Sequence, residues 1–198
     1  MPSSDWTPIS NGSGSYAIVA AGGAPSGPDV MQIATGGQLF ENITGGPFKD
    51  SRVSGWVKLP ASVDRFYLCL RSLDDTTFIT APASFFLARI LTNSATEFEI
   101  FISAVENGVL TNILNILCPA QNGDPQNTWQ QYQFSALNSG TDVLLRIAQW
   151  DGAAFIPVAD CAAPIATFPT LDAAGSCRFG ALITNATQID DVNYYSLT

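Results

Sequence analysis

Short runs of β-branched and aromatic residues, separated by glycine, proline, asparagine and serine, follow one another along nearly the whole chain. Such runs predict β-strands, and the residues between them predict turns. We expect strands over residues 16–20, 30–34, 38–41, 52–59, 65–71, 84–91, 97–105, 110–117, 129–136, 142–150, 154–158, 177–184 and 188–197. No amphipathic helix is expected beyond one short turn within residues 168–174. The pattern therefore predicts an all-β protein.

Within several of these runs, apolar and polar residues alternate with a period of two, as a sheet with one buried face requires. In residues 65–71 we expect the apolar row, Phe66, Leu68 and Leu70, to point inward. We expect the other row to point outward, and it consists of Arg65, Tyr67, Cys69 and Arg71. Asn107-Gly108 and Asp151-Gly152 favour tight hairpin turns, because they tolerate positive φ. No internal repeat of about 20 to 50 residues is present, which argues against a propeller or solenoid. We therefore predict an antiparallel two-sheet sandwich of the jelly-roll type.

The order of the pieces resembles a known family. Over residues 38–198 the chain runs through "SRVSGWVKL", "RFYLCLRS", "ASFFLARIL", "EFEIFISAVENGVL", "NTWQQYQFSALNSGTDVLLRIAQWDG", "AGSCRFGALI" and "TQIDDVNYYSL". This is similar to the concanavalin A-like or laminin-G-like jelly roll. The resemblance implies glycan or protein binding, in some members with calcium, and in others glycoside hydrolysis or lyase chemistry. Hydrolase members carry Glu-x-Asp-x-x-Glu on one strand, and here the nearest run, Glu97-Phe98-Glu99, stops short of it.

The chain is expected to form one domain, because an all-β domain can reach about 200 residues. Residues 38–198 form the predicted jelly roll. Residues 1–37 differ from the rest, since prolines and glycine pairs surround two weak strands. Two interpretations stay open: an arm laid over a neighbouring subunit, or first strands of the same sandwich that cover an edge.

Composition excludes several classes of function. The 198 residues include 8 Lys and Arg and 17 Asp and Glu, for a net charge of −9, and the cations are scattered, so nucleic-acid binding is not expected. The chain contains no histidine, which removes His-dependent triads and His-ligated zinc sites. No apolar run is long enough to span a membrane. We therefore do not expect an enzyme or a membrane protein.

The beginning of the chain, "MPSSDWTPI", lacks the pattern of a secretory signal, so we expect the protein to stay in a cytosol. An acidic, His-free β protein of this kind resembles accessory virion proteins of tailed bacteriophages. That resemblance implies a non-enzymatic structural role as a capsid decoration or fibre protein, partnered by capsid or tail proteins and homo-oligomeric, in a virion assembled in the host cytoplasm. The alternative is a carbohydrate-binding module or lectin that attaches to host-surface glycans. A glycoside hydrolase or lyase is the third hypothesis.

The four cysteines lack C-x-x-C spacing. We interpret them as small buried apolar residues. If any pair is bonded, Cys161 and Cys177 are the best candidates, because they flank one loop-rich segment.

Four residues are candidates for ligand binding: Trp56, Tyr67, Arg71 and Trp150. Together with Phe101 and Arg146, they fall on strand faces opposite the apolar rows. Aromatic and arginine side chains on such a face can stack on sugars or anchor a protein partner. The alternative is that these side chains pack in the core or under loops.

Asp190 and Asp191 are candidates for a metal site, because adjacent carboxylates beside Asn193 offer oxygen ligands to calcium. Alternation along the strand places Asp191, Asn193 and Tyr195 on one face and Asp190 on the other. The alternative is a turn at the start of the strand that is capped by aspartate. No other cofactor is expected.

Overall fold

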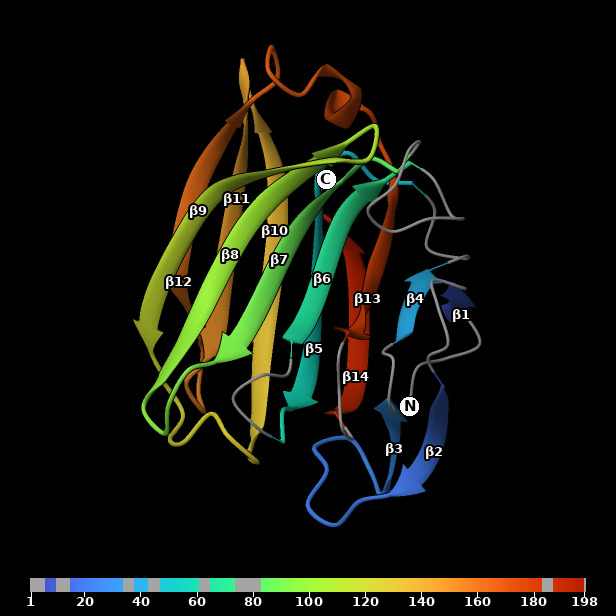
Figure 1. Cartoon of the computed structure of the whole chain (residues 1–198), viewed down its shortest axis with the longest axis vertical. Helices are drawn as coiled ribbons and strands as arrows, with labels where there is room; N and C mark the ends of the chain where they lie inside the picture. The colour runs from blue at the N-terminus through green and yellow to red at the C-terminus, as the bar shows by residue number, and fades with distance from the viewer. Residues whose placement is uncertain are drawn as a thin grey trace.

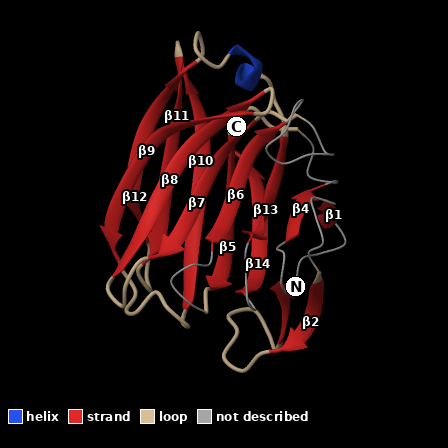
Figure 2. Cartoon of the chain, in the orientation of Figure 1, coloured by secondary structure: helices blue, strands red, loops and turns tan. Residues whose placement is uncertain are grey.

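The computed structural model describes residues 6–9, 15–33, 38–42, 47–60, 65–73, 83–182 and 187–197. Two antiparallel sheets lie face to face, and one short helix lies at one end of them (Figures 1 and 2). The all-β, two-sheet jelly-roll prediction is confirmed. In the described part of the chain, no helix is long and apolar enough to cross a membrane.

The first sheet, here called sheet A, has seven strands in the described residues. They are, in spatial order, β1 (Trp6–Ile9), β4 (Gln38–Asn42), β13 (Ser176–Leu182), β6 (Arg65–Ser72), β7 (Phe85–Thr92), β8 (Glu97–Glu106) and β9 (Val109–Pro119). Strands β6 to β9 follow one another in the chain and in space. This run of hairpins forms the broad front layer in Figure 1.

Sheet B also has seven strands in the described residues. They are, in spatial order, β12 (Phe155–Pro164), β11 (Asp142–Trp150), β10 (Trp129–Ser139), β5 (Ser51–Lys58), β14 (Thr187–Ser196), β3 (Asp29–Ile33) and β2 (Tyr16–Ala20). The helical turn η1 (Pro169–Asp172) lies between β12 and β13 in the chain. Each sheet therefore combines strands from distant parts of the sequence.

The chain before residue 38 contributes strands to both sheets. β1 pairs with β4 in sheet A, whereas β3 pairs with β14 and β2 with β3 in sheet B. Trp6 of β1 is buried and packs edge-on against Phe179, with 4.7 Å between ring centroids. β1 was not among the predicted strands. Its four residues include Pro8, which cannot donate to a sheet and lowers the strand signal.

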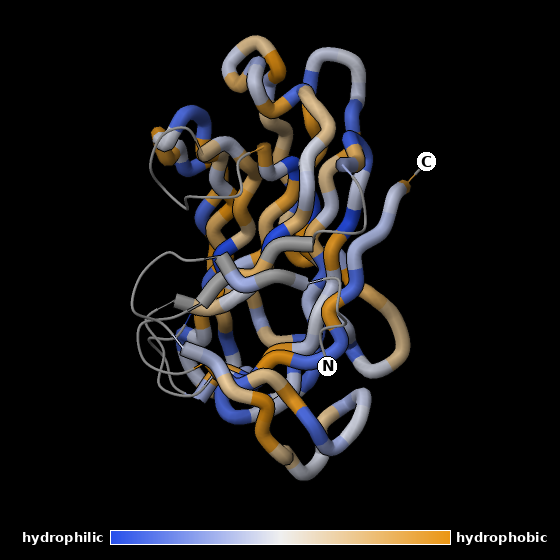
Figure 3. The backbone as a smooth tube through the Cα atoms, turned by 90° about the vertical axis from the view of Figure 1, so that its right-hand side faces the viewer, coloured by the Kyte–Doolittle hydropathy of each residue, from blue (hydrophilic) through white to orange (hydrophobic). Residues whose placement is uncertain are grey.

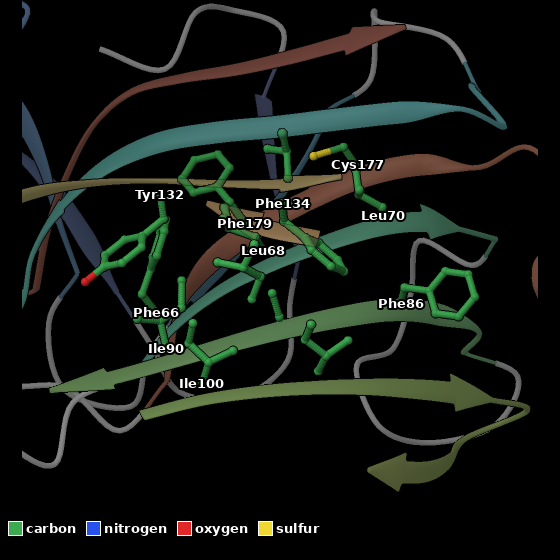
Figure 4. Close-up of a cluster of buried hydrophobic side chains, with 14 of the residues drawn as sticks. Phe66, Leu68, Leu70, Phe86, Ile90, Ile100, Tyr132, Phe134, Cys177 and Phe179 are labelled. Carbon is green, nitrogen blue, oxygen red and sulfur yellow. The ribbon is translucent and has the colours of Figure 1, made fainter. Parts of the chain in front are cut away.

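The core lies between the sheets and follows the predicted alternation. Phe66, Leu68 and Leu70 of β6 point inward with Phe134 of β10, and all four are fully buried (Figure 4). Hydrophobic and hydrophilic positions alternate along the strands in the side view (Figure 3). Burial of each such side chain stabilises the fold by about 1.5–3 kcal/mol.

The hairpin signals in the sequence are confirmed. Asn107 and Gly108 join β8 to β9 with φ of 50° and 79°, the left-handed conformation that this two-residue turn requires. Gly152, with φ of 104°, lies in the turn between β11 and β12. These turns set the register and thereby decide which side chains share an outer face.

Candidate functional site

The predicted binding residues are divided between the two outer faces of the sandwich. Trp56, Arg146 and Trp150 alternate with core residues of β5 and β11 and therefore lie on the outer face of sheet B. Tyr67 and Phe101 lie on the outer face of sheet A. The structure therefore does not unite these residues in a single site.

Arg71 lies at neither outer face, contrary to the alternation of its strand. Its φ of 55° is left-handed, and the pairing of β6 with β13 shifts register beside it, which turns the side chain into the end of the sandwich. The guanidinium donates to the carbonyls of Lys49 and Leu171, at 2.7 and 2.8 Å, and to Oδ1 of Asn138 at 2.5 Å. It also lies 3.5 Å from Asp50 and is fully buried. Arg71 therefore joins parts of the fold and has no surface with which to bind a ligand.

Part of the outer face of sheet A is buried. Tyr67 is only 4% exposed and belongs to a second apolar cluster, separate from the main core, that includes Cys69, Phe85, Leu87 and Val105. The prediction that Tyr67 points away from the main core is confirmed, but the outer face of sheet A around Tyr67 is not open to solvent. The open part of sheet A lies farther along, over β8 and β9.

Two arginines extend this surface beside Tyr67. In the register, Tyr67 is opposite Arg89, which is opposite Phe101, and Arg65 is one row away on β6. The guanidinium carbon of Arg89 lies 3.8 Å from the centre of the Phe101 ring, a close cation–π contact. Both arginines are hydrogen-bonded to Tyr67. Burial raises the pKa of Tyr67, and the bond with Arg65 opposes that rise.

Sheet B presents a more open outer face with three of the four tryptophans of the chain. Trp56 of β5 is opposite Gln131 of β10, and Trp129 lies two residues earlier on the same face of β10. Trp150 closes β11 and packs edge-on against Phe155, at 5.3 Å between ring centroids. All three tryptophans are half-buried, so part of each ring faces solvent.

Polar side chains occupy the middle of this face. One row across the strands consists of Tyr195, Arg52, Ser135, Arg146 and Asp160. The next row toward the tryptophans consists of Asn193, Ser54, Gln133, Ala148 and Pro157. The second row consists largely of small side chains, which project less from the sheet than the tryptophans on one side and the arginines on the other.

A groove of about 520 Å³ lies over the arginine row of sheet B. Its lining includes Arg52, Gln133, Ser135, Leu137, Leu144 and Arg146. Leu137 and Leu144 are opposite one another and more than two-fifths exposed, which gives the groove an apolar edge. The volume is within the range of about 300–1,000 Å³ that is usual for ligand pockets.

The two arginines of the groove differ in their partners. Arg146 forms a solvent-exposed ion pair with Asp160, with 2.5 Å between Nε and Oδ1. Arg52 lies over the ring of Tyr195, at 5.4 Å from the centroid. The Nε of Arg52 is buried and has no hydrogen-bond acceptor in the described part of the chain. Arg52 therefore retains a donor that a bound molecule can use.

Sequence reasoning missed Trp129, Arg52 and Tyr195. The signal for Trp129 was present, because Tyr132 and Phe134 define the buried row of β10 and place residue 129 on the opposite face. No pattern in the sequence could have shown that β14, β5 and β10 bring Tyr195 and Arg52 together, since that depends on pairing between distant strands.

Asp190 is fully buried and serves as a hydrogen-bond acceptor within the fold. Its carboxylate accepts from the backbone N–H and hydroxyl of Ser26, at 2.9 and 2.5 Å, and from the N–H of Asp191 at 2.9 Å. Asp191 has a φ of 46° within a bulge of β14, and its Oδ1 accepts from Asn193 at 3.1 Å. In the part of the chain that the structure describes, no group of three or more His, Cys, Asp or Glu could hold a metal ion. Asp190 therefore anchors the turn before β3 to β14.

The four cysteines are thiols, and no disulfide joins them. Burial raises the pKa of Cys69 to about 12, and burial together with Asp160 raises that of Cys161 to about 11. At pH 8 both groups are protonated, and only a thiolate attacks a disulfide reagent. We expect the native protein to react slowly with an aromatic disulfide reagent at pH 8 and all four thiols to react after unfolding. Fast reaction of Cys161 in the native protein would contradict this assignment.

Comparison with known proteins gives relatives in structure only. No protein-family model and no curated sequence matches the chain. The carbohydrate-binding module CBM66 from Bacillus subtilis is similar with a TM-score of 0.57 and 17% identity, over 97% of this chain and 96% of that one. A legume lectin-like domain from Entamoeba histolytica has a TM-score of 0.62 and 7% identity, over 98% of this chain and 91% of that one.

A GH16 protein of the Bacteroides ovatus mixed-linkage glucan PUL, in complex with a G4G4G3G product, is also similar. Its TM-score is 0.57 at 9% identity, over 91% of this chain and 85% of that one. At such identities the likeness concerns the arrangement of strands. The chain therefore has the jelly-roll fold of concanavalin A-like and legume-lectin-like domains.

Proposed function

We propose that this protein is a non-catalytic carbohydrate-binding domain that holds an extended glycan along the outer face of sheet B. The observation that carries the proposal is the register of that face, which places three tryptophans at one end, amides and hydroxyls in the middle and an arginine-lined groove at the other end. The carbohydrate-binding module and lectin-like domains among the structural neighbours support this class of ligand.

The chemistry of the face matches that of a sugar chain. Pyranose rings have apolar C–H faces that stack on indole rings, and their hydroxyls both donate and accept hydrogen bonds. Gln131 and Gln133 offer amide donors and acceptors along β10. The buried Nε1 of Trp129 and Nε of Arg52 have no acceptor among the described residues, so each can donate to a hydroxyl of the glycan.

The length of the face favours a chain of sugars over a single one. From Trp129 to Leu137, β10 rises about 26 Å at about 3.3 Å per residue. The tryptophans lie near the beginning of this stretch of β10, and the groove lies near its end. One monosaccharide cannot contact both ends, whereas an oligosaccharide can.

A binding role is favoured over hydrolysis by the residues of β8. Glu97 and Glu99 alternate with the core residues Phe98 and Ile100 and share the outer face of sheet A. In the hydrolase motif Glu-x-Asp-x-x-Glu, the third carboxylate would stand at position 102, and here that residue is Ile102, which is buried in the core. The row of carboxylates on β8 therefore ends at Glu99 and lacks the last acid of the hydrolase motif.

The test is titration calorimetry with a panel of soluble neutral polysaccharides and their oligosaccharides. We expect saturable binding to at least one of them, with longer oligosaccharides binding more tightly than the monosaccharide. Ser135→Trp, which fills the floor of the groove, should weaken binding about tenfold or more, whereas Thr111→Trp on exposed β9 of sheet A should leave it unchanged. Absence of binding to every member of the panel would refute the proposal.

A further inference from the structure

A second feature of the surface lies on the opposite sheet and is independent of the proposed glycan site. Arg65 and Arg89 project from neighbouring strands β6 and β7 on the outer face of sheet A. Arg65 is opposite Leu91, and Arg89 is opposite Tyr67, so the two arginines are diagonal neighbours with Cα atoms about 7–8 Å apart. Both side chains are partly open to solvent.

Each of these arginines has an unused donor. The Nε atoms of Arg65 and Arg89 are buried, and neither has a hydrogen-bond acceptor among the residues that the structure describes. By contrast, Arg71 has an acceptor on all three of its nitrogen atoms, and Nε of Arg146 is paired with Asp160. A buried donor without an acceptor is costly, so two of them side by side require an explanation.

The charges around the pair leave an excess of positive charge. Burial lowers the pKa of Arg89, and repulsion from Arg65 acts in the same direction. Glu99 of β8 acts in the opposite direction on Arg89. Tyr67 is neutral at pH 7, since the ordinary pKa of tyrosine is about 10 and burial raises it further. In a chain of net charge −9, two adjacent arginines form a local positive site, because Glu99 is the one acidic residue of the described part of the chain that acts on Arg89.

The Phe101 ring supports one guanidinium of the pair. The guanidinium carbon of Arg89 lies 3.8 Å from the centre of that ring. A guanidinium held in this way loses little side-chain entropy when it binds, and its planar donors match the oxygens of a carboxylate or sulfate. Asn115, the next residue in the same row, is exposed and offers an amide to the rest of a ligand.

We propose that Arg65 and Arg89 form an oxyanion-binding site on the outer face of sheet A that takes a carboxylate or sulfate group. The group can come from a free anion or from an acidic sugar, and the chemistry of recognition is the same in both cases. The anion accepts hydrogen bonds from the two guanidinium groups and neutralises the charge of the pair.

The test is an NMR titration of protein labelled with ¹⁵N at arginine, which reports each Nε–H group directly. The probes are sodium sulfate, sodium glucuronate and neutral glucose, at constant ionic strength. We expect saturable shifts of the Arg65 and Arg89 signals with an anion and none with glucose. Shifts with sulfate and glucuronate support an oxyanion site for either source, and shifts with glucuronate alone support the acidic sugar.

Variants separate this site from general salt effects. Arg65→Gln and Arg89→Gln should each weaken anion binding about tenfold or more, because each removes one charge-assisted hydrogen bond. Lys49→Gln, which removes an exposed positive charge paired with Asp172 and lies outside both proposed sites, should leave it unchanged. If no arginine signal of the pair saturates, if glucose shifts them equally, or if Lys49→Gln has the same effect, the proposal is overturned. Titration of the unaltered protein decides the matter even where a variant fails to fold.

Discussion

Replacing Arg71 by alanine is expected to lower the free energy of unfolding by about 3–5 kcal/mol. The guanidinium is fully buried and holds the carbonyls of Lys49 and Leu171 and the amide of Asn138. Its removal leaves these acceptors without a donor and removes the positive partner of Asp50. Urea unfolding followed by tryptophan fluorescence measures the change.

A matched control is Arg146→Ala, which removes an arginine of the same size from an exposed ion pair with Asp160. An exposed pair contributes about 0–1 kcal/mol, so the control should retain nearly all of the stability. Equal losses in the two variants would show that burial and internal acceptors do not distinguish Arg71. Arg71 would then not be what holds the end of the sandwich together.

The second large effect concerns glycan affinity. Trp56→Ala is expected to weaken binding of the best oligosaccharide about 30-fold, as loss of a central aromatic contact commonly costs about 2 kcal/mol. Trp150→Ala should act in the same direction, and both variants should remain folded because the rings lie on the outer face of sheet B. Titration calorimetry measures the affinity.

Leu117→Ala provides a control for this pair, since Leu117 is 57% exposed on the opposite sheet. Its glycan affinity should equal that of the unaltered protein. If both tryptophan variants bind the oligosaccharide as tightly as the unaltered protein does, the glycan does not bind to the outer face of sheet B.

The fold could be predicted from the sequence because alternation and turn residues act locally. Residues 65–71 show both the success and its limit. Phe66 and Leu68 point into the core as predicted, yet Tyr67 on the opposite face of the strand is also buried. The alternation of residues along a strand shows which side chains share a face, but not whether other residues cover that face. Arg71 leaves the alternation altogether, since its left-handed φ and the register shift opposite β13 depend on long-range pairing.

The candidate site was harder to predict for the same reason. Alternation along the strands puts Trp56 and Trp150 on the faces opposite the apolar rows, but only the order of β5, β10 and β11 places them on one surface with Trp129. The virion role, the capsid or tail partners and the homo-oligomer stay predictions from the sequence, since neither the fold nor the structural neighbours bear on them. Calcium at Asp190 and Asp191 gains no support, because Asp190 uses its carboxylate within the fold.

The most direct measurement of the central claim is an NMR titration of the tryptophan indole N–H signals with the best-binding oligosaccharide. The chain has four tryptophans, three on the outer face of sheet B and Trp6 buried between the sheets, so the protein carries its own control. We predict saturable shifts of Trp56, Trp129 and Trp150 and none of Trp6. Binding that leaves all three outer tryptophans unshifted would contradict the proposal that sheet B holds the glycan.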